Sequence, residues 1–374
     1  MSSEIGAPPE DLSIKLVIHK GRTTDPGNAR LGQIYAGESM RKQFFTAPVM
    51  YLFAFLLALN GKAQSNAPLK LVQKIPMPGV QGRMDHLSVD ISGKRLFVPA
   101  NGDNQNTVEV IDLQAGKRIA SIPGQSKPQG TFYSPDFNTL FVTNGTDGTC
   151  KIFRGDNFKL IDSLLLGSDA NQVGYDPDTK YLYAGLGDRN SGALAIVDTS
   201  NNRHIGDIKT DARPGGITFE KSGPRIFVNL NGATKLGVLD RKKREQITTW
   251  PVAGAENYGP LALDESHHRL FLGTRKPPML IVFDTESGKQ ITQLDSVPSI
   301  DGVWYDAMRK RIYITGNGFI AVYDQKGADD YTPMVKVASE ADSQPSIWVP
   351  QFNRLYFSVP QAGNRDAEIL VYEP

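Results

Sequence analysis

Short apolar runs alternate with polar turns along the chain from about residue 69 to its end. One signature recurs in these runs: an aromatic residue flanked on both sides by aliphatic or small apolar residues. The intervals between successive aromatics are 44, 42, 44, 44, 42 and 43 residues, which indicates a structural repeat. The seven central aromatics are Phe97, Phe141, Tyr183, Phe227, Phe271, Tyr313 and Tyr356.

Each of the first six repeats contains three further runs around this signature. One precedes the aromatic by about seven residues, as at residues 87–90, and another follows a Gly/Asn-rich loop and ends in Asp, as at residues 108–112. Runs rich in Val, Ile, Phe and Tyr between Gly, Asn and Asp turns are typical of β-strands. No sustained helical periodicity is present, so the repeat predicts an all-β, seven-bladed β-propeller with four antiparallel strands per blade.

The two ends of the repeat region complement each other. The seventh repeat stops at residues 369–374 after only three predicted strands, whereas residues 70–76 form an extra strand before the first repeat. We expect the strand at residues 70–76 to pair into the last blade and close the ring, which removes exposed strand edges. Residues 69–374 are thus predicted to form a single propeller domain.

The region before the repeats carries a different pattern. Residues 40–63, from Met40 to Ala63, combine a basic start, an uncharged apolar run at 44–59 and small residues before a cleavage point after Ala63. These are the three parts of a secretory signal peptide, and they predict a periplasmic or secreted protein. Residues 1–39 precede this signal and are expected to be a mis-assigned extension; the alternative is a short cytoplasmic tail on an uncleaved anchor.

Composition narrows the functional classes. The chain has 41 basic and 40 acidic side chains and a net charge of +1, which gives no broad field for attracting nucleic acid. The one cysteine, Cys150, excludes an internal disulfide and a Cys-based zinc site. No nucleophile elbow, P-loop or dinucleotide fingerprint occurs, so the sequence indicates no cofactor and requires no enzyme.

A family resemblance is carried by the first repeat. Its segments 97–101 and 107–112, its Gly116-Lys117 turn and its segment 119–124 resemble the repeat of YVTN-type (YncE-like) seven-bladed propellers. The resemblance covers about residues 69–374 and is weaker in two repeats, where Arg154 and Glu373 replace the usual Asp. It implies a secreted or periplasmic protein with a binding role, which in some members is single-stranded DNA binding.

Candidate chemistry lies where the innermost strands begin, because these positions form one mouth of the central channel. Arg83, Asp85 and His86 occur together there in the first repeat. One interpretation is that cations at the mouth hold an anion while His86 acts as a base or ligand; the other is that these groups satisfy each other and the channel water. A metal site is disfavoured, since adjacent strand residues point to opposite faces. The full set of candidates is Arg83, Asp85, His86, Lys127, Gln129, Gln172, Arg213, Tyr258, Asp301 and Gln344.

The sequence therefore predicts an exported, monomeric binding module for a small molecule or a protein partner, without stable membrane insertion. Its expected ligand surface is the channel mouth with the loops at residues 101–106, 187–192 and 361–366. The main alternative is a lactonase-like hydrolase or lyase acting on a small anionic substrate, with His86, Arg83 and Arg213 in one pocket. A third reading, nucleic-acid binding, predicts affinity that falls steeply with salt.

Overall fold

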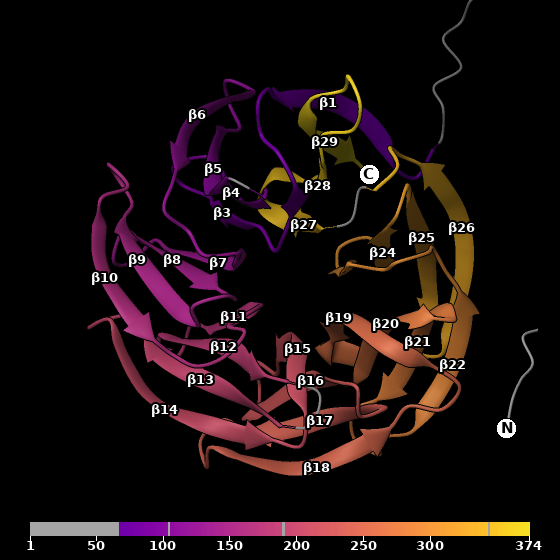
Figure 1. Cartoon of the computed structure of the whole chain (residues 1–374). Coiled ribbons are helices and arrows are strands. Elements are labelled where there is room, and N and C mark those ends of the chain that lie inside the picture. Colours follow the sequence, from indigo (N-terminus) through magenta and orange to yellow (C-terminus); the bar gives the residue numbers. More distant parts are fainter. Residues whose placement is uncertain (1–66, 104, 189–190, 343–344) are drawn as a thin grey trace, which may run out of the picture. The chain divides into compact units, whose positions relative to one another are not determined.

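Seven antiparallel four-stranded sheets surround a central channel in the computed structural model of the chain (Figure 1). The structure describes residues 67–103, 105–188, 191–342 and 345–374, and the side chains of Asn257 and Tyr258 are outside this description. The predicted signal peptide at 40–63 and the extension at 1–39 also lie outside the described residues. Within the described part of the chain, no helix is long and apolar enough to cross a membrane.

The blades follow one another in chain order, each with its first strand innermost. The first blade contains β2 (Arg83–Met84) and β3 (Ser88–Asp90), which together form its innermost strand, and β4 (Arg95–Asn101), β5 (Asn106–Asp112) and β6 (Lys117–Ile122). The second contains β7 (Pro128–Ser134), β8 (Thr139–Asn144), β9 (Thr149–Arg154) and β10 (Leu160–Leu165). The third contains β11 (Val173–Asp176), β12 (Tyr181–Gly187), β13 (Gly192–Asp198) and β14 (Arg203–Thr210). The next three are β15 (Arg213–Phe219), β16 (Arg225–Asn231), β17 (Lys235–Asp240), β18 (Glu245–Pro251); β19 (Glu256–Asp264), β20 (Arg269–Lys276), β21 (Pro278–Asp284), β22 (Gln290–Asp295); β23 (Gly302–Asp306), β24 (Arg311–Gly316), β25 (Phe319–Gly327), β26 (Asp330–Ala338). The seventh is β27 (Ser346–Val349), β28 (Arg354–Val359), β29 (Ala367–Glu373) and β1 (Lys70–Met77).

The repeated aromatics form the core between the blades. All seven lie in the second strand of a blade and are at most 4% exposed. Phe97 of the first blade packs with Tyr133 and Leu140 of the second, and Phe227 of the fourth packs with Leu270 of the fifth. Because each blade buries its apolar face against its neighbour, the ring is stabilised as a unit.

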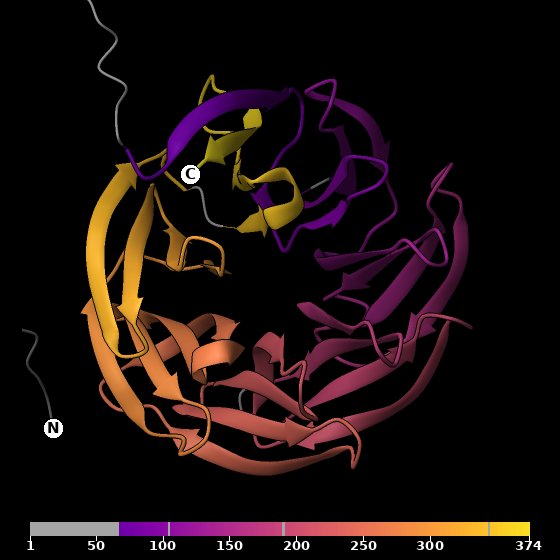
Figure 2. The same ribbon diagram turned by 180° about the vertical axis from the view of Figure 1, so that it is seen from behind.

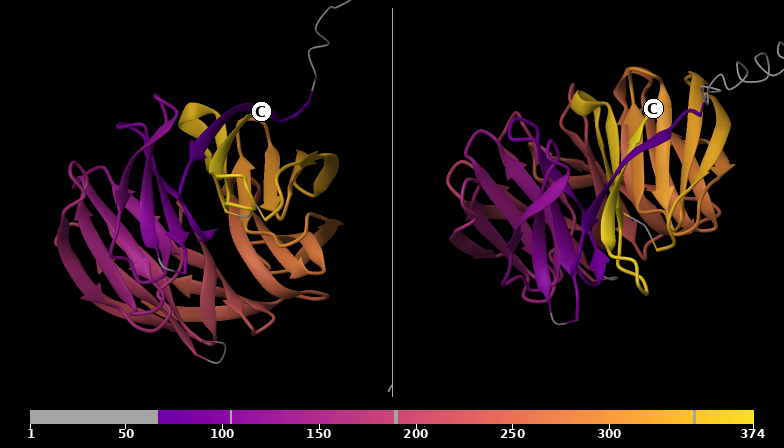
Figure 3. Two further views of the ribbon diagram at one scale, coloured as in Figure 1. Left: turned by 45° about the horizontal axis from the view of Figure 1, so that its top comes forward. Right: turned by 90° about the horizontal axis from the view of Figure 1, so that it is seen from above.

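The N-terminal strand completes the seventh blade, as predicted. Strand β1 pairs antiparallel with β29, and Ile75 and Met77 are fully buried in the core shared by the first and last blades. Figures 2 and 3 show this strand lying along the C-terminal strands at the outer side of the ring. The fold is therefore the all-β, seven-bladed propeller that the repeats indicate.

Arginines at the starts of second strands join neighbouring blades at the end of the ring opposite the channel mouth. We call Arg95, Arg225 and Arg269 the latch arginines. Arg225 pairs with Glu220 in its own blade, and its Nη1 donates to Thr285 O of the next blade at 2.6 Å. Arg95 and Arg269 likewise reach Gly155 O and Asp329 Oδ1 in the blades that follow them. Each latch arginine thus binds groups on two blades.

The basic turn at residues 241–244 contributes to the same end. The sequence favours a solvated turn here, but the side chain of Arg241 is only 7% exposed. Its Nε lies 3.1 Å from Asp176 Oδ2 of the preceding blade, and its Nη1 donates to Glu220 O. A turn that faces a neighbouring blade thus has less contact with water than its charge suggests. Lys242 and Lys243 of the same turn are exposed.

Candidate functional site

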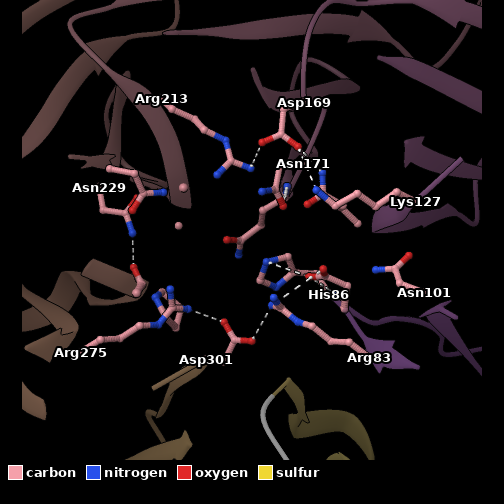
Figure 4. Close-up of a pocket in the computed structure, with 18 residues that line it drawn as sticks. Arg83, His86, Asn101, Lys127, Asp169, Asn171, Arg213, Asn229, Arg275 and Asp301 are labelled. Atoms are coloured by element: carbon pink, nitrogen blue, oxygen red, sulfur yellow. Dashed lines mark hydrogen bonds and ion pairs between the residues drawn. The ribbon is translucent and has the colours of Figure 1, made fainter. Parts of the chain in front are cut away.

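A polar cavity of about 350 Å³ opens where the first strands begin and the second strands end. Antiparallel pairing brings these ends together: Arg83 lies opposite Asn101, and Arg213 lies opposite Asn231. Residues from the first six blades line it, and Figure 4 shows their side chains converging on its centre.

One side of the cavity contains a carboxylate held between two arginines, which we call the Asp301 set. Asp301 precedes β23 and is 5% exposed. Its Oδ1 lies 2.7 Å from Arg275 Nη2 and its Oδ2 lies 3.3 Å from Arg83 Nη2. Arg275 also donates from Nε to Ile300 O at 2.8 Å. Three blades therefore supply this set, and the carboxylate fixes both guanidinium groups.

The opposite side contains a second carboxylate between two cations, the Asp169 set (Figure 4). Asp169 Oδ2 lies 2.7 Å from Arg213 Nη2, and its Oδ1 lies 3.6 Å from Lys127 Nζ. Gln129 Nε2 donates to the same Oδ1 at 2.7 Å. The backbone has positive φ at both Lys127 and Asp169, and the chain enters its inner strand just beyond them. This set is again assembled from three consecutive blades.

His86 lies in an interruption of the innermost strand of the first blade. Asp85, His86 and Leu87 separate β2 from β3, and His86 N donates to Gln129 O of the next blade at 3.1 Å. Asp85 Oδ1 accepts a hydrogen bond from His86 N at 3.1 Å and lies 3.5 Å from His86 Nε2. The expectation that Asp85 and His86 point to opposite faces was wrong, because the regular alternation of a strand is lost at this interruption.

Burial sets the electrostatics of Asp85. This residue is 4% exposed, and desolvation raises the pKa of its carboxyl, opposed by the charges of His86 and Arg83. Asp85 in turn raises the pKa of the Arg83 guanidinium, its Oδ2 being 3.9 Å from Arg83 Nη2. Four cationic side chains and three carboxylates are found among the described lining residues, so the cavity has a net charge of +1 with His86 neutral.

Most sequence candidates line this cavity. The structure places eight of them in its wall: Arg83, Asp85, His86, Lys127, Gln129, Gln172, Arg213 and Asp301. Gln344 lies outside the described residues, as does the side chain of Tyr258, although the Tyr258 backbone pairs with Thr274. Of the three loops expected at the surface of the site, only Asn101 lines the cavity among the residues described.

Apart from Asn101, which belongs to the predicted loop at residues 101–106, sequence reasoning missed the contribution of the second strands. Their ends supply Asn101, Asn229, Asn231 and Arg275 to the cavity. Asn101, Asn231 and Arg275 each follow the aromatic of their repeat by four positions, so the spacing of the repeats predicts their place. Asn229 is 1% exposed and donates from Nδ2 to Gly259 O, while its Oδ1 has no hydrogen-bond partner among the described residues.

The fourth and fifth blades also line the cavity with three glycines and a proline: Gly215, Gly216, Gly259 and Pro260. A Cβ at Gly215 would lie 2.2 Å from Asn229 Oδ1, so glycine leaves the space that this amide occupies. The cavity thus combines permanent cations and amides, which suits a small polar anion. No group of three or more His, Cys, Asp and Glu with metal-binding geometry occurs in the described ranges.

Comparisons with known proteins establish the fold. No family model matches the sequence, and no curated protein matches it. A chain of Kuenenia stuttgartiensis hydrazine synthase is similar at a TM-score of 0.66 and 14% identity, over 75% of this chain and 94% of that one. A chain in the crystal structure of the mitotic checkpoint complex gives a TM-score of 0.66 at 12% identity, over 91% of this chain and 99% of that one. The β-propeller domain of Cps50 (Swd1) from Myceliophteria thermophila gives 0.62 at 13% identity, over 82% and 100%. At such identities the likeness shows a shared β-propeller architecture and nothing finer.

Proposed function

We propose that this protein is an exported binding module of the YVTN type whose ligand site is the cavity at the channel mouth. The observation that carries the proposal is the convergence of Arg83, Lys127, Arg213 and Arg275 on one cavity with a net charge of +1. Propellers are rigid scaffolds, and concave surfaces at the ends of such scaffolds are common ligand sites. The ligand we propose is a small polar anion.

The partial exposure of the cations supports binding over a purely structural role. The side chains of Arg83, Lys127 and Arg275 are 57%, 52% and 38% exposed, although each contacts a carboxylate. A guanidinium carries five N–H donors and an ammonium three, so one carboxylate contact leaves several donors for a ligand. Oriented donors at the mouth of a cavity attract an anion and also fix its position.

A thermal-shift screen of the purified protein tests the site. Small carboxylates and phosphates are expected to raise the melting temperature, because a ligand that binds only the folded state stabilises it. Sugars, lactones, quinones, metal ions and oligonucleotides complete the screen. The expected shift disappears in a Lys127→Ala, Arg213→Ala variant and persists in Lys242→Ala, which removes an exposed cation from the opposite end. A shift that survives the first variant would contradict the site.

Export is tested separately. The full chain, expressed in a bacterial host, is expected to leave the cytoplasm and to begin at Gln64 after cleavage. N-terminal sequencing of the product gives the answer directly. A product that keeps residues 40–63 would overturn cleavage and favour a retained anchor.

A hydrolase or lyase acting on a small anion is the second candidate. The observation in its favour is that His86 shares the cavity with Arg83 and Arg213, and that its Nε2 lies close to a carboxylate. A neutral imidazole in this setting would accept a proton from water, and the arginines would hold the substrate. Sugar lactones are the test substrates, and an Arg83→Ala, His86→Ala, Arg213→Ala variant must lose any hydrolysis found. Hydrolysis that survives the triple replacement would exclude this centre.

A further inference from the structure

The two cation sets of the cavity have the same composition and face each other. Each contains one carboxylate between two cationic side chains, and therefore carries a net charge of +1. In Figure 4, Lys127, Asp169 and Arg213 lie along one side of the cavity, and Arg83, Asp301 and Arg275 lie along the other. The charge is thus divided between two separated places.

The carboxylates of Asp301 and Asp169 hold the cationic side chains of the two sets in place. Asp301 binds a different arginine with each of its oxygens, and Asp169 does the same with Arg213 and Lys127. Because both oxygens are engaged, the carboxylates hold the cations in position and leave the remaining N–H donors to face the cavity. Side chains fixed in this way lose less entropy when a ligand binds.

Asp85 and His86 are the remaining titratable groups on the Asp301 side. The charged groups around them are Arg83 and Asp301, and the neighbouring strand β7 presents Gln129 O and Gly130 to the backbone at His86. Asp85 Oδ1 and His86 Nε2 are 3.5 Å apart, and Asp85 Oδ2 lies 3.9 Å from Arg83 Nη2. The Asp85 carboxylate therefore reduces the positive charge on the Asp301 side.

We propose, resting on the proposed binding function, that the cavity takes a small compound with an anionic group at each end. One end binds Lys127 and Arg213, and the other binds Arg83 and Arg275. A dicarboxylate is the simplest member of this class. Asn229, which lies between Arg213 and Arg275 in Figure 4, is placed to contact the middle of such a ligand.

The test compares probes of equal length with different charge: succinate, its monoamide succinamate and neutral succinamide. Succinate is expected to bind about tenfold more tightly than succinamate, because only succinate places an anionic group at both sets of cations. Titration calorimetry on the purified protein measures the affinities. Malonate, glutarate and adipate then identify the preferred separation of the two charges.

Variants on each side assign the ends. Arg83→Gln with Arg275→Gln removes the cations of the Asp301 set, so the affinity for succinate is expected to fall to that for succinamate. Lys127→Met with Arg213→Gln is expected to weaken both probes. Asp85→Asn removes one carboxylate beside Arg83, so the preference for succinate over succinamate is expected to be larger in this variant than in the parent protein. Melting temperatures without ligand check that each variant folds.

The outcomes separate this inference from the proposed function. If succinamate binds as tightly as succinate and both are lost on replacing Lys127 and Arg213, the mouth is an anion site and the two-ended ligand is wrong. If neither probe binds and no anion of the thermal-shift screen binds either, the proposed function fails together with the inference.

Discussion

Arginines occur at both ends of the propeller channel, and their surroundings differ. A latch arginine such as Arg225 has a side chain only 21% exposed, contacts acceptors on two blades and lies 5.4 Å from the centre of the Phe227 ring. Arg83 at the mouth is 57% exposed, and its side chain forms ion pairs with Asp85 and Asp301, which it shares with other groups. The same residue type therefore stabilises the ring at one end and remains accessible to solvent at the other.

The largest expected effect comes from removing a latch arginine. Arg225→Ala leaves Glu220, which is 8% exposed, without its main partner, and also removes the contact to Thr285 O. Because an unpaired buried charge is strongly destabilising, we expect a loss of about 3 kcal/mol in the free energy of unfolding. Urea denaturation measures it. Arg83→Ala at the mouth is the control and should cost about 1 kcal/mol or less, because Arg83 is 57% exposed and Asp301 keeps Arg275 at 2.7 Å; equal losses would remove the distinction between the two ends.

Two glycines offer a smaller, matched comparison. A Cβ at Gly93 would lie 2.2 Å from Asp90 Oδ2 and 3.0 Å from Arg95 Nε, whereas a Cβ at Gly215 would lie 2.2 Å from Asn229 Oδ1. Gly93→Ala displaces a buried ion pair and is expected to cost about 2 kcal/mol. Gly215→Ala displaces an oxygen without a partner among the described residues and should cost about 1 kcal/mol. Its main effect is expected on ligand affinity, which calorimetry tests with the anions identified in the screen.

The sequence predicted the mouth in part, and the register of the repeat explains both the success and the misses. Alignment on the aromatic anchors located the starts of the first strands, and therefore Arg83, Lys127, Arg213 and Asp301. The ends of the second strands follow from the same register, because the end of each second strand lies opposite the start of its first strand, as Asn101 lies opposite Arg83. Finding them required the pairing of the two strands as well as the spacing of the repeats.

The ion pairing could not be predicted in the same way. Asp301 meets Arg83 of another blade, 218 residues away in sequence, and this contact depends on the angle between blades and on side-chain rotamers. The interruption at Asp85 and His86 could not be predicted either, because an apolar–polar pattern predicts a strand but not the point where its backbone hydrogen bonds to the next strand are interrupted. Spacing thus determines which positions face the channel, whereas three-dimensional packing determines which of them meet.

Asp85 and Asp90 are expected to change the stability of the fold with pH in opposite directions. Burial raises the pKa of both carboxyls, but at Asp90 the hydrogen bonds from Gly93 N, Arg95 and Ser92 outweigh burial and the net pKa is lowered. Asp90 therefore contributes stability that is present above its unfolded pKa and is lost as the pH falls below about 4. Asp85 behaves in the opposite way, since folding takes up a proton and stability falls as the pH rises above about 4 through its raised pKa.

Conservative amides at these two positions measure the difference. As the pH rises from about 2 to about 5, the free energy of unfolding of Asp90→Asn is expected to decrease relative to the parent protein, because the parent gains the contribution of ionised Asp90 over this range. Above about pH 4, that of Asp85→Asn is expected to increase relative to the parent, because the parent loses the contribution of protonated Asp85. Urea denaturation at several pH values gives both slopes. Parallel slopes for the two variants would show that the carboxylates at the two ends are held by the same forces.

The smallest expected effect on stability belongs to Arg83. Its contacts with Asp301 and Asp85 are 3.3 and 3.9 Å long, and more than half of its side chain is exposed, so solvent screens both interactions. Asp301 keeps Arg275 at 2.7 Å when Arg83 is removed, which prevents the buried carboxylate from losing all its partners. Arg83→Gln is therefore expected to change the free energy of unfolding by about 0.5 kcal/mol or less, while anion affinity falls by about tenfold. Destabilisation on the scale of Arg225→Ala would instead assign Arg83 to the forces that hold the ring together.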